Sequence, residues 1–494
     1  MNKICVNNYA LDPEQLKPIL ENPKYSIIIA GAGSGKTLTL IGKVKYLLEN
    51  HLLNPEEICM ISFTNEATRD LQRNIQKNCK VEIPIFTFHK LALDILKKEH
   101  ITYQIAKPDF LEYTIEEFFQ AKCFGNTFLI KKCYQVFDYP SFFSWGFLLK
   151  SPKFSGIKKK IATFITLCKA NGYFQNDLKH ILKLSKKEPL LYLIYAIYLF
   201  YESNKNSAAI LDFDDIILKT TEYLQTHSVS LPYKMLIIDE FQDTSLCRFQ
   251  FVQEIIRLTD ASLCVVGDDY QSIYHFSGCD LTIFLQFTKY YPTAKVYKLE
   301  RTYRNSEELV KTAGEFIQKN PNQIKKELTS DKHLEKPIKL VFYKRVDTAL
   351  EKILVKISED KEVFILGRNH FDIKKYTKKL SYTEKENHQI VFDKFPNLNI
   401  RFLTVHSSKG LESDVVILLN LEHALYGFPI LLKDEKLLSL IKKEQPYPFE
   451  EERRLFYVGI TRTKSVVYVM IPRYNPSYFV KELKKHKNVE KIFL

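Results

Sequence analysis

The sequence predicts an α/β protein with two parallel-sheet domains and a helical insertion in the first of them. The chain has 494 residues, and a single core stops growing near ~250–300 residues. Short apolar runs rich in Ile and Val recur along it, and each ends at a turn followed by a helical pattern. Such strands, alternating with helices, indicate parallel sheets covered on both faces. The expected strands are 26–30, 58–63, 235–238, 263–266, 363–366, 415–420 and 466–471.

The domain limits follow from where these runs stop. Residues 95–208 are rich in Phe, Tyr and Lys, lack strand-like runs, and repeat apolar residues at helical spacing. We therefore expect them to form a helical insertion between 1–94 and 209–292, which together make the first sheet domain. The second sheet domain is expected at 293–494.

Composition narrows the functional classes. The net charge of +14 favours a polyanionic partner, although solvated lysines explain it equally well. Nine cysteines without a CxxC pair argue against a zinc ribbon or an iron–sulfur cluster, and they fit the reducing cytoplasm. The N-terminal residues lack a signal-peptide pattern, and the apolar run 189–201 is too short to cross a bilayer. No membrane partner is expected.

The segment Gly31–Thr37 follows the first expected strand and has the pattern of a phosphate-binding loop. Glycines let backbone N–H groups wrap the phosphates, and the next helix points its N-terminus at them. Lys36 is expected to reach the β- and γ-phosphates, and the Thr37 hydroxyl to bind magnesium. A glycine-rich structural turn is the alternative. The expected ATP contacts in this loop are Gly31, Ala32, Gly33, Ser34, Gly35, Lys36 and Thr37.

An acidic pair follows the expected strand 235–238. Asp239 is placed to hold Mg²⁺, and Glu240 to orient and deprotonate the attacking water. The expected cofactors are therefore ATP and Mg²⁺.

Residues 239–244, DEFQDT, resemble the second motif of the UvrD/Rep/PcrA helicases of superfamily 1. Other motifs of that family have counterparts in the expected order at 11–15, 266–274, 299–304, 403–412 and 452–462. The resemblance implies two RecA-like domains, called 1A and 2A, with ATP hydrolysed between them and the insertion, 1B, in the first.

Roles for further nucleotide contacts come from this resemblance alone. It implies that Gln15 reads the adenine edge, that Tyr303 stacks on the base, and that Glu412 reaches the nucleotide. It further implies that Gln271 lies near the γ-phosphate and that two arginine fingers, Arg304 and Arg462, come from the second domain. The catalytic set is therefore Lys36, Asp239, Glu240, Gln271, Arg304 and Arg462.

The resemblance also implies contacts to a DNA strand. Aromatic platforms with polar backbone contacts suit sequence-tolerant binding of single strands. For Phe63, a core position at a strand end is the alternative. Residues 212–215 are read as a structural return from the insertion, with a metal site as the less favoured alternative. The expected DNA contacts are Phe63, Thr64, Asn65, Thr87, His89, Tyr274, Phe276 and His406.

The family's large 2B subdomain has room here only for a vestige at 375–399. We expect an ATP-dependent translocase or helicase on single-stranded or partly duplex DNA, moving 3′ to 5′. We expect no room for a fused nuclease after the motif at 452–462. The architecture is similar to the helicase component of Gabija-type anti-phage systems, which suggests a separate nuclease partner. The alternatives are a DNA-end-sensing and nucleotide-sensing regulatory subunit, a small-molecule kinase, or RNA in place of DNA.

Overall fold

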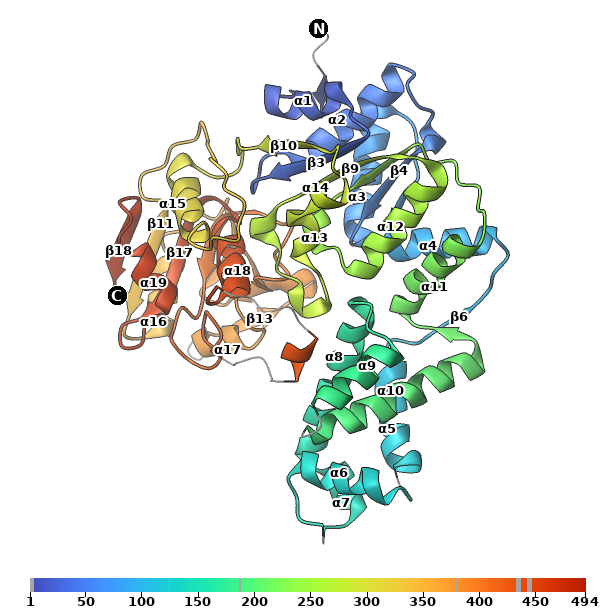
Figure 1. Cartoon of the computed structure of the whole chain (residues 1–494). Coiled ribbons are helices and arrows are strands. Elements are labelled where there is room, and N and C mark those ends of the chain that lie inside the picture. The colour runs from blue at the N-terminus through green and yellow to red at the C-terminus, as the bar shows by residue number, and fades with distance from the viewer. Residues whose placement is uncertain are drawn as a thin grey trace.

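The computed structural model describes residues 4–123, 125–141, 143–185, 188–377, 380–431, 437–441 and 447–494. Two sheet domains lie next to each other, and a bundle of helices extends from the first, which confirms the α/β fold expected from the sequence (Figure 1). Each of the seven expected strands coincides with a strand of the structure, with ends that differ by a few residues.

The first domain is a six-stranded parallel sheet in the order β10-β3-β9-β8-β4-β5. Its apolar strands are buried between helices, and a separate cluster of buried side chains covers each face. A short hairpin, β1 (Cys5–Val6) and β2 (Tyr9–Ala10), precedes it. The strands are β3 (Tyr25–Ala30), β4 (Ile58–Ser62), β5 (Ile85–Thr87), β8 (Met235–Ile238), β9 (Ser262–Gly267) and β10 (Lys295–Leu299). The helices are α1 (Pro13–Glu21), α2 (Lys36–Glu49), α3 (Asn65–Cys79), α4 (Phe88–Lys98), α11 (Phe213–Thr226), α12 (Leu246–Thr259), α13 (Leu281–Leu285) and α14 (Phe287–Tyr290).

Two expected domain limits need correction. Strand β10 pairs in parallel with β3, so the first sheet continues past the limit placed at residue 293. Only Tyr297 and Leu299 of β10 are buried, as suits an edge strand, and this alternation hid the strand from a search for continuous apolar runs. The limit placed at residue 95 cuts α4, whose Ile95 belongs to the core of the first domain.

The insertion is helical, as expected. A short parallel pair, β6 (Gln104–Ile105) with β7 (Ile210–Leu211), marks where the chain leaves and returns. Its helices are α5 (Phe110–Glu117), α6 (Thr127–Phe137), α7 (Trp145–Lys150), α8 (Pro152–Ala170), α9 (Gln175–Leu184) and α10 (Pro189–Ala208). Leu437 and Ile441 of the second domain belong to the same buried cluster as its apolar side chains, so the two parts of the chain touch here. Within the described ranges, no helix combines the length and apolar character that a membrane span requires.

The second domain has an eight-stranded sheet in the order β13-β14-β15-β12-β16-β17-β11-β18. Six neighbouring strands of this sheet run parallel, in the order β15-β12-β16-β17-β11-β18, and helices cover them. The strands are β11 (Ile338–Tyr343), β12 (Glu362–Gly367), β13 (Tyr382–Glu384), β14 (Gln389–Phe392), β15 (Phe395–Thr404), β16 (Ser413–Leu418), β17 (Thr463–Pro472) and β18 (Val489–Phe493). The helices are α15 (Glu307–Ile317), α16 (Val346–Leu354), α17 (Asp372–Tyr376), α18 (Glu450–Ile460) and α19 (Tyr478–Leu483).

The segment 375–399, expected to hold a vestige of 2B, forms part of this sheet. Strands β13 and β14 pair antiparallel with each other, and β14 pairs antiparallel with β15. The described residues of the segment therefore extend the sheet by a hairpin at its edge and form no separate body. Lys378 and Lys379 lie outside the described residues.

A buried group of charges joins the insertion to the first domain. The Lys169 ammonium of α8 lies 2.5 Å from Asp215 Oδ1 and also binds Asp212. Lys205 of α10 lies 3.2 Å from Asp212 Oδ2 and 2.5 Å from Asp215 Oδ2. Asp212 caps α11. Two lysines thus neutralise the carboxylates of Asp212 and Asp215, which agrees with a structural role for this return from the insertion.

Lys169→Met leaves Asp212 and Asp215 with Lys205 as their remaining lysine. Because removing one partner leaves a buried charge uncompensated, we expect the free energy of unfolding to fall by about 3–5 kcal/mol. Urea unfolding followed by circular dichroism measures this. Lys159→Met, at an exposed position of the same helix, should change it by no more than ~0.5 kcal/mol. Equal values for the two variants would contradict the assigned role of the group.

Candidate functional site

The loop between β3 and α2 has backbone geometry that glycine alone adopts readily. Gly33 and Gly35 have φ angles of +72° and +79°, in the left-handed region. A Cβ on Gly33 would lie 2.6 Å from Arg304 Cβ, and one on Gly35 would lie 2.4 Å from Gln15 Nε2. The α2 N-terminus begins at Lys36. The loop therefore has the open backbone that phosphate binding requires.

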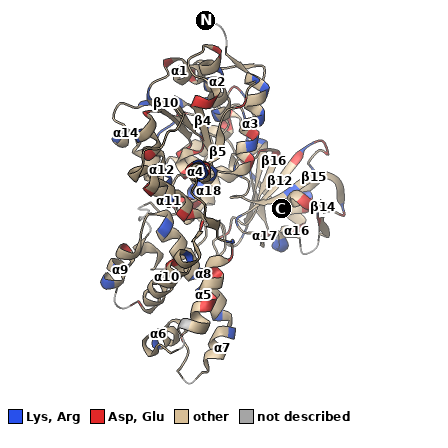
Figure 2. Cartoon of the chain, turned by 90° about the vertical axis from the view of Figure 1, so that its right-hand side faces the viewer, with Lys and Arg blue, Asp and Glu red and all other residues tan. Residues whose placement is uncertain are grey.

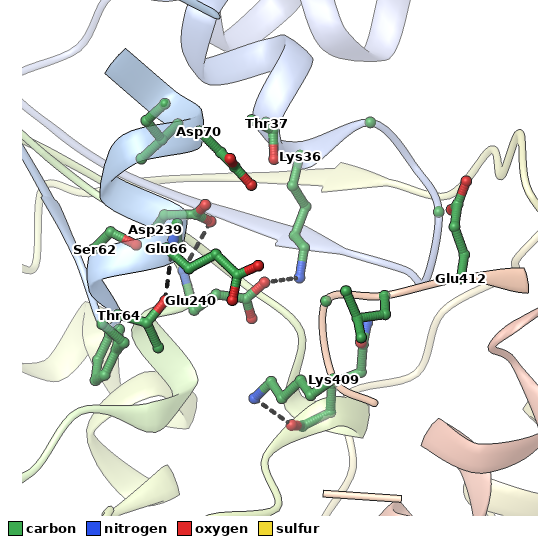
Figure 3. A pocket seen from close by; sticks show the side chains of 18 of the residues that line it. Lys36, Thr37, Ser62, Thr64, Glu66, Asp70, Asp239, Glu240, Lys409 and Glu412 are labelled. Carbon is green, nitrogen blue, oxygen red and sulfur yellow. Dashed lines mark hydrogen bonds and ion pairs between the residues drawn. The ribbon is translucent and has the colours of Figure 1, made fainter. Parts of the chain in front are cut away.

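The side chains of Lys36, Asp239 and Glu240 form one charged group at the C-terminal edge of the sheet (Figure 3). Lys36 Nζ donates to Glu240 Oε1 at 2.9 Å. Burial alone would lower the pKa of Lys36, but the neighbouring carboxylates, led by Glu240, raise it overall. The charge of Lys36 is therefore secure in this buried position.

The two carboxyl groups of the pair differ in acidity. Burial, aided by the charge of Glu240, raises the pKa of Asp239 to about 6. Burial would also raise the pKa of Glu240, but the ammonium groups of Lys36 and Lys409 lower it to about 2. Their surroundings thus give two adjacent carboxyl groups different pKa values. Such a difference is typical of active sites in which two carboxyl groups have different roles.

A cavity of about 590 Å³ opens around this group. Side chains from both sheet domains line it, and Figure 3 shows Lys36, Glu240, Lys409 and Glu412 around the same space. Asp243 Oδ1 and Ser62 Oγ are buried at its wall without a hydrogen-bond partner among the described residues. The Thr37 hydroxyl and the Asp239 carboxylate supply oxygen ligands of the kind that Mg²⁺ prefers, so the residues present fit a nucleotide with its magnesium ion. The expected nucleotide and magnesium contacts on the wall are Gly33, Ser34, Gly35, Lys36, Thr37, Asp239, Glu240, Gln271, Tyr303, Arg304, Glu412 and Arg462.

Both expected arginine fingers reach the cavity, each held by a partner. Arg304 Nε donates to Glu412 Oε2 at 2.6 Å. Arg462 is fully buried and donates from Nη2 to Gln271 Oε1 at 2.8 Å. Burial, with the charge of Arg304, lowers the pKa of Arg462 to about 9, so the guanidinium stays charged at neutral pH. Two positive charges from the second domain therefore face the Lys36 of the first.

The side chain of Gln15, expected to read the adenine edge, already has hydrogen-bond partners in the protein. It is buried, and its amide already binds the protein: Oε1 accepts from Asp12 N at 3.1 Å, and Nε2 donates to Ser34 O at 3.2 Å. Gln15 therefore supports the loop from behind and is absent from the cavity wall. Tyr303 is 42% exposed, and its hydroxyl binds Asp12.

Gly31 and Ala32 contact Leu328 and Thr302, which lie in the linking segment between β10 and β11. A Cβ on Gly31 would lie 2.4 Å from Leu328 Cδ2, and Ala32 O accepts from Thr302 Oγ1 at 2.7 Å. Neither residue lines the cavity. Of the expected loop contacts, these two therefore lie under the linking segment.

Two lysines at the domain junction were absent from the expected site. Lys409 donates to Gln271 O at 2.8 Å and pairs with Asp243. Its place within the family motif at 403–412 was a sequence signal for it. Lys326 is fully buried and pairs with Asp268 and Asp269, yet it lies in a stretch without a recognisable pattern. No sequence signal pointed to Lys326.

The expected strand contacts of domain 1A form one group beside the cavity. Phe63 is partly buried and lines the cavity. Its ring packs edge-to-face against that of Phe88, with the ring centres 5.3 Å apart. The Thr64 and Thr87 hydroxyls cap α3 and α4 by accepting from backbone N–H groups, and Asn65 is exposed in the first turn of α3. Burial, with the charge of Arg248, lowers the pKa of His89 to about 4. The two threonines therefore have structural tasks already.

Tyr274, Phe276 and His406 form an aromatic trio between the two domains. The Phe276 and His406 ring centres are 5.4 Å apart, and those of Tyr274 and Phe276 are 6.0 Å apart. Burial, with the charges of Arg368 and Lys409, lowers the pKa of His406 to about 4, so its ring is neutral at pH 7. Phe276 is 50% exposed, and with His406 it lines a second cavity of about 1310 Å³. Exposed aromatic faces in such a cavity suit stacking with bases.

Comparison with known proteins agrees with this geometry. Residues 11–292 match the UvrD/REP helicase N-terminal domain, and residues 372–474 match the UvrD-like helicase C-terminal domain. The chain is 26% identical to DNA helicase IV of Escherichia coli (strain K12), with 97% of this chain and 71% of that protein covered.

Two further relatives are similar over a smaller part. ATP-dependent DNA helicase Rep of Buchnera aphidicola subsp. Schizaphis graminum is 28% identical, over 67% of this chain and 48% of its own length. ATP-dependent DNA helicase PcrA of Bacillus subtilis is 28% identical, over 68% of this chain and 42% of its own. The chain thus spans less than half of these two relatives. Because the N-terminal family match alone covers more than half of the 494 residues, the chain belongs to the UvrD/REP helicase family.

Proposed function

We propose that this protein is an ATP-dependent motor that translocates along single-stranded DNA and unwinds partly duplex DNA. One observation carries the proposal: Lys36 and Glu240 of the first domain and Arg304 and Arg462 of the second line the same cavity. A γ-phosphate bound there would attract both arginines. Its loss on hydrolysis would release them, which couples chemistry to movement between the domains.

In the proposed mechanism, the site residues divide the work. Lys36 and the loop N–H groups bind the phosphates, and Thr37 and Asp239 would hold Mg²⁺, which neutralises charge on the phosphates when bound. Glu240, ionised at neutral pH, orients the attacking water and accepts its proton. Gln271 joins Arg462 to the first domain at 2.8 Å, so it is placed to report the state of the phosphate to both sheets.

The strand contacts in the proposal are the aromatic trio and the group around Phe63. Their stacking and phosphate contacts are sequence-tolerant. The 3′ to 5′ direction is proposed from the family resemblance. RNA shares these contact types, and competition between DNA and RNA strands distinguishes the two.

A separate nuclease subunit is the proposed partner, as in Gabija-type anti-phage systems. This part rests on a likeness in domain content. A nuclease gene beside the gene for this chain would support it, and its absence would count against it. The nine free cysteines agree with the proposed cytoplasmic location.

ATP hydrolysis with and without single-stranded DNA tests the central claim. We expect strong stimulation by DNA, and no hydrolysis above background in Lys36→Ala. Glu240→Gln should lower kcat by about 10²–10⁴-fold, because a general base is lost, while ATP binding persists. A slow rate that ignores DNA would overturn the motor and favour a regulatory subunit.

Phe276→Ala removes an exposed stacking surface from the second cavity. We expect single-stranded DNA to bind more weakly by about 1–3 kcal/mol, measured by fluorescence anisotropy. Tyr9→Ala, which removes another exposed aromatic ring (69%) in the N-terminal hairpin, is the matched control and should bind as the unaltered protein does. Equal affinity of both variants would remove Phe276 from the strand site.

A further inference from the structure

The second domain has a groove that continues from the aromatic trio to the hairpin β13–β14. Besides the cavity of about 1310 Å³, a neighbouring cavity of about 410 Å³ lies under this hairpin. The two share four wall residues: His370, Phe371, Thr404 and Ser407. They are therefore adjoining sections of one groove that begins at Phe276 and His406.

Exposed cations line the hairpin section of the groove. Lys374 of α17 and Lys385 of the hairpin turn are on its wall with His370 and His388, and Figure 2 shows basic residues in blue at α17. Within the described part of the chain, neither lysine pairs with a carboxylate. Asn387 and His388 have φ angles of +57° and +63°, which folds the turn tightly between β13 and β14. The acid on this wall, Glu384, receives a hydrogen bond from Tyr382 at 3.4 Å.

The point where the two sections meet carries an exposed aromatic ring. Phe371 is 51% exposed, and its ring lies edge-to-face at 5.7 Å from that of Tyr426. It therefore offers a free ring face in the groove, as Phe276 does in the first section. Aromatic rings spaced between unpaired cations are the pattern of sites that bind single strands without sequence preference.

Two carboxylates on the wall of the first section, Glu450 and Glu452, are paired with arginines. Glu452 accepts from Arg368 Nη2 at 2.7 Å and from Arg368 Nε at 2.9 Å. Glu450 accepts from Arg454 Nη1 at 2.8 Å. These pairs limit repulsion of a phosphate backbone that enters from the aromatic trio.

We propose that the hairpin β13–β14 and α17 form a second section of the single-strand path, in which Phe371 stacks on a base and Lys374 and Lys385 contact phosphates. This inference rests on the proposed binding of single-stranded DNA at the aromatic trio. The edge hairpin of the second sheet is then a nucleic-acid-binding element, and the strand occupies a longer site than the domain junction alone provides.

The test compares binding of two oligothymidylates, a short one of roughly 8 nucleotides and a long one of roughly 20, to the whole chain. In Lys374→Gln/Lys385→Gln, loss of two phosphate contacts should make the salt slope for the long strand flatter by about 1.4. The advantage of the unaltered protein should therefore shrink about sevenfold between about 50 and 200 mM salt. Phe371→Ala should weaken binding of the long strand by about 5- to 150-fold. The short strand should bind all variants equally.

Lys481→Gln/Lys485→Gln is the matched control, since it removes two exposed lysines near the opposite edge of the same sheet. Unchanged affinity and salt slope for the long strand in the Lys374/Lys385 variant would overturn the inference. So would an equal loss in the control pair, or a loss confined to blunt duplex DNA. If the unaltered protein binds neither strand, the proposed function fails first. All variants should melt at the temperature of the unaltered protein, because the substituted side chains are exposed.

Discussion

The arrangement of the two domains depends on buried charges around the turn Asp268–Ser272 at the end of β9. Lys326 pairs with Asp268, and Lys409 donates to Gln271 O at 2.8 Å. Arg462 binds the Gln271 side chain at 2.8 Å, and Arg454 donates to Ser272 O at 2.7 Å. All four cations come from the second half of the chain. Because buried charges are tolerated only while paired, this turn fixes the position of the second domain relative to the first.

The same turn connects the two proposed sites. Gln271 and Tyr274 line the nucleotide cavity, and Phe276, only two residues further, lines the cavity proposed for the strand. If the γ-phosphate shifts this turn, the ring of Phe276 would therefore move with it, because no helix or strand of another segment has to transmit the movement. His406 contacts this ring from the second domain, so both halves of the chain meet the proposed strand at one place.

Much of this structure could be predicted from the sequence, and what could not has physical reasons. Buried parallel strands are recognisable as apolar runs. The phosphate-binding loop is recognisable by the spacing of Gly33, Gly35 and Lys36. The edge strand β10 was missed because alternate residues are exposed, so its sequence lacks a continuous apolar run. The hydrogen bond from Gln15 Nε2 to Ser34 O joins residues 19 positions apart, and no pattern in the sequence indicated it. The buried position of Lys326 could not be predicted, because it pairs with Asp268, which is distant in the sequence, and the residues around Lys326 form no recognisable motif.

The linking segment has a consequence for dividing this chain into fragments. A polypeptide ending at residue 292 would lose β10, and with it the backbone hydrogen bonds that protect the outer edge of β3. It would also lose Lys326, leaving Asp268 and Asp269 as buried carboxylates without that counter-ion. An exposed apolar strand edge invites pairing with other chains. A fragment that keeps β10 and the counter-ion of Asp268 and Asp269 must therefore extend past Lys326, well inside the part of the sequence that looks like the second domain.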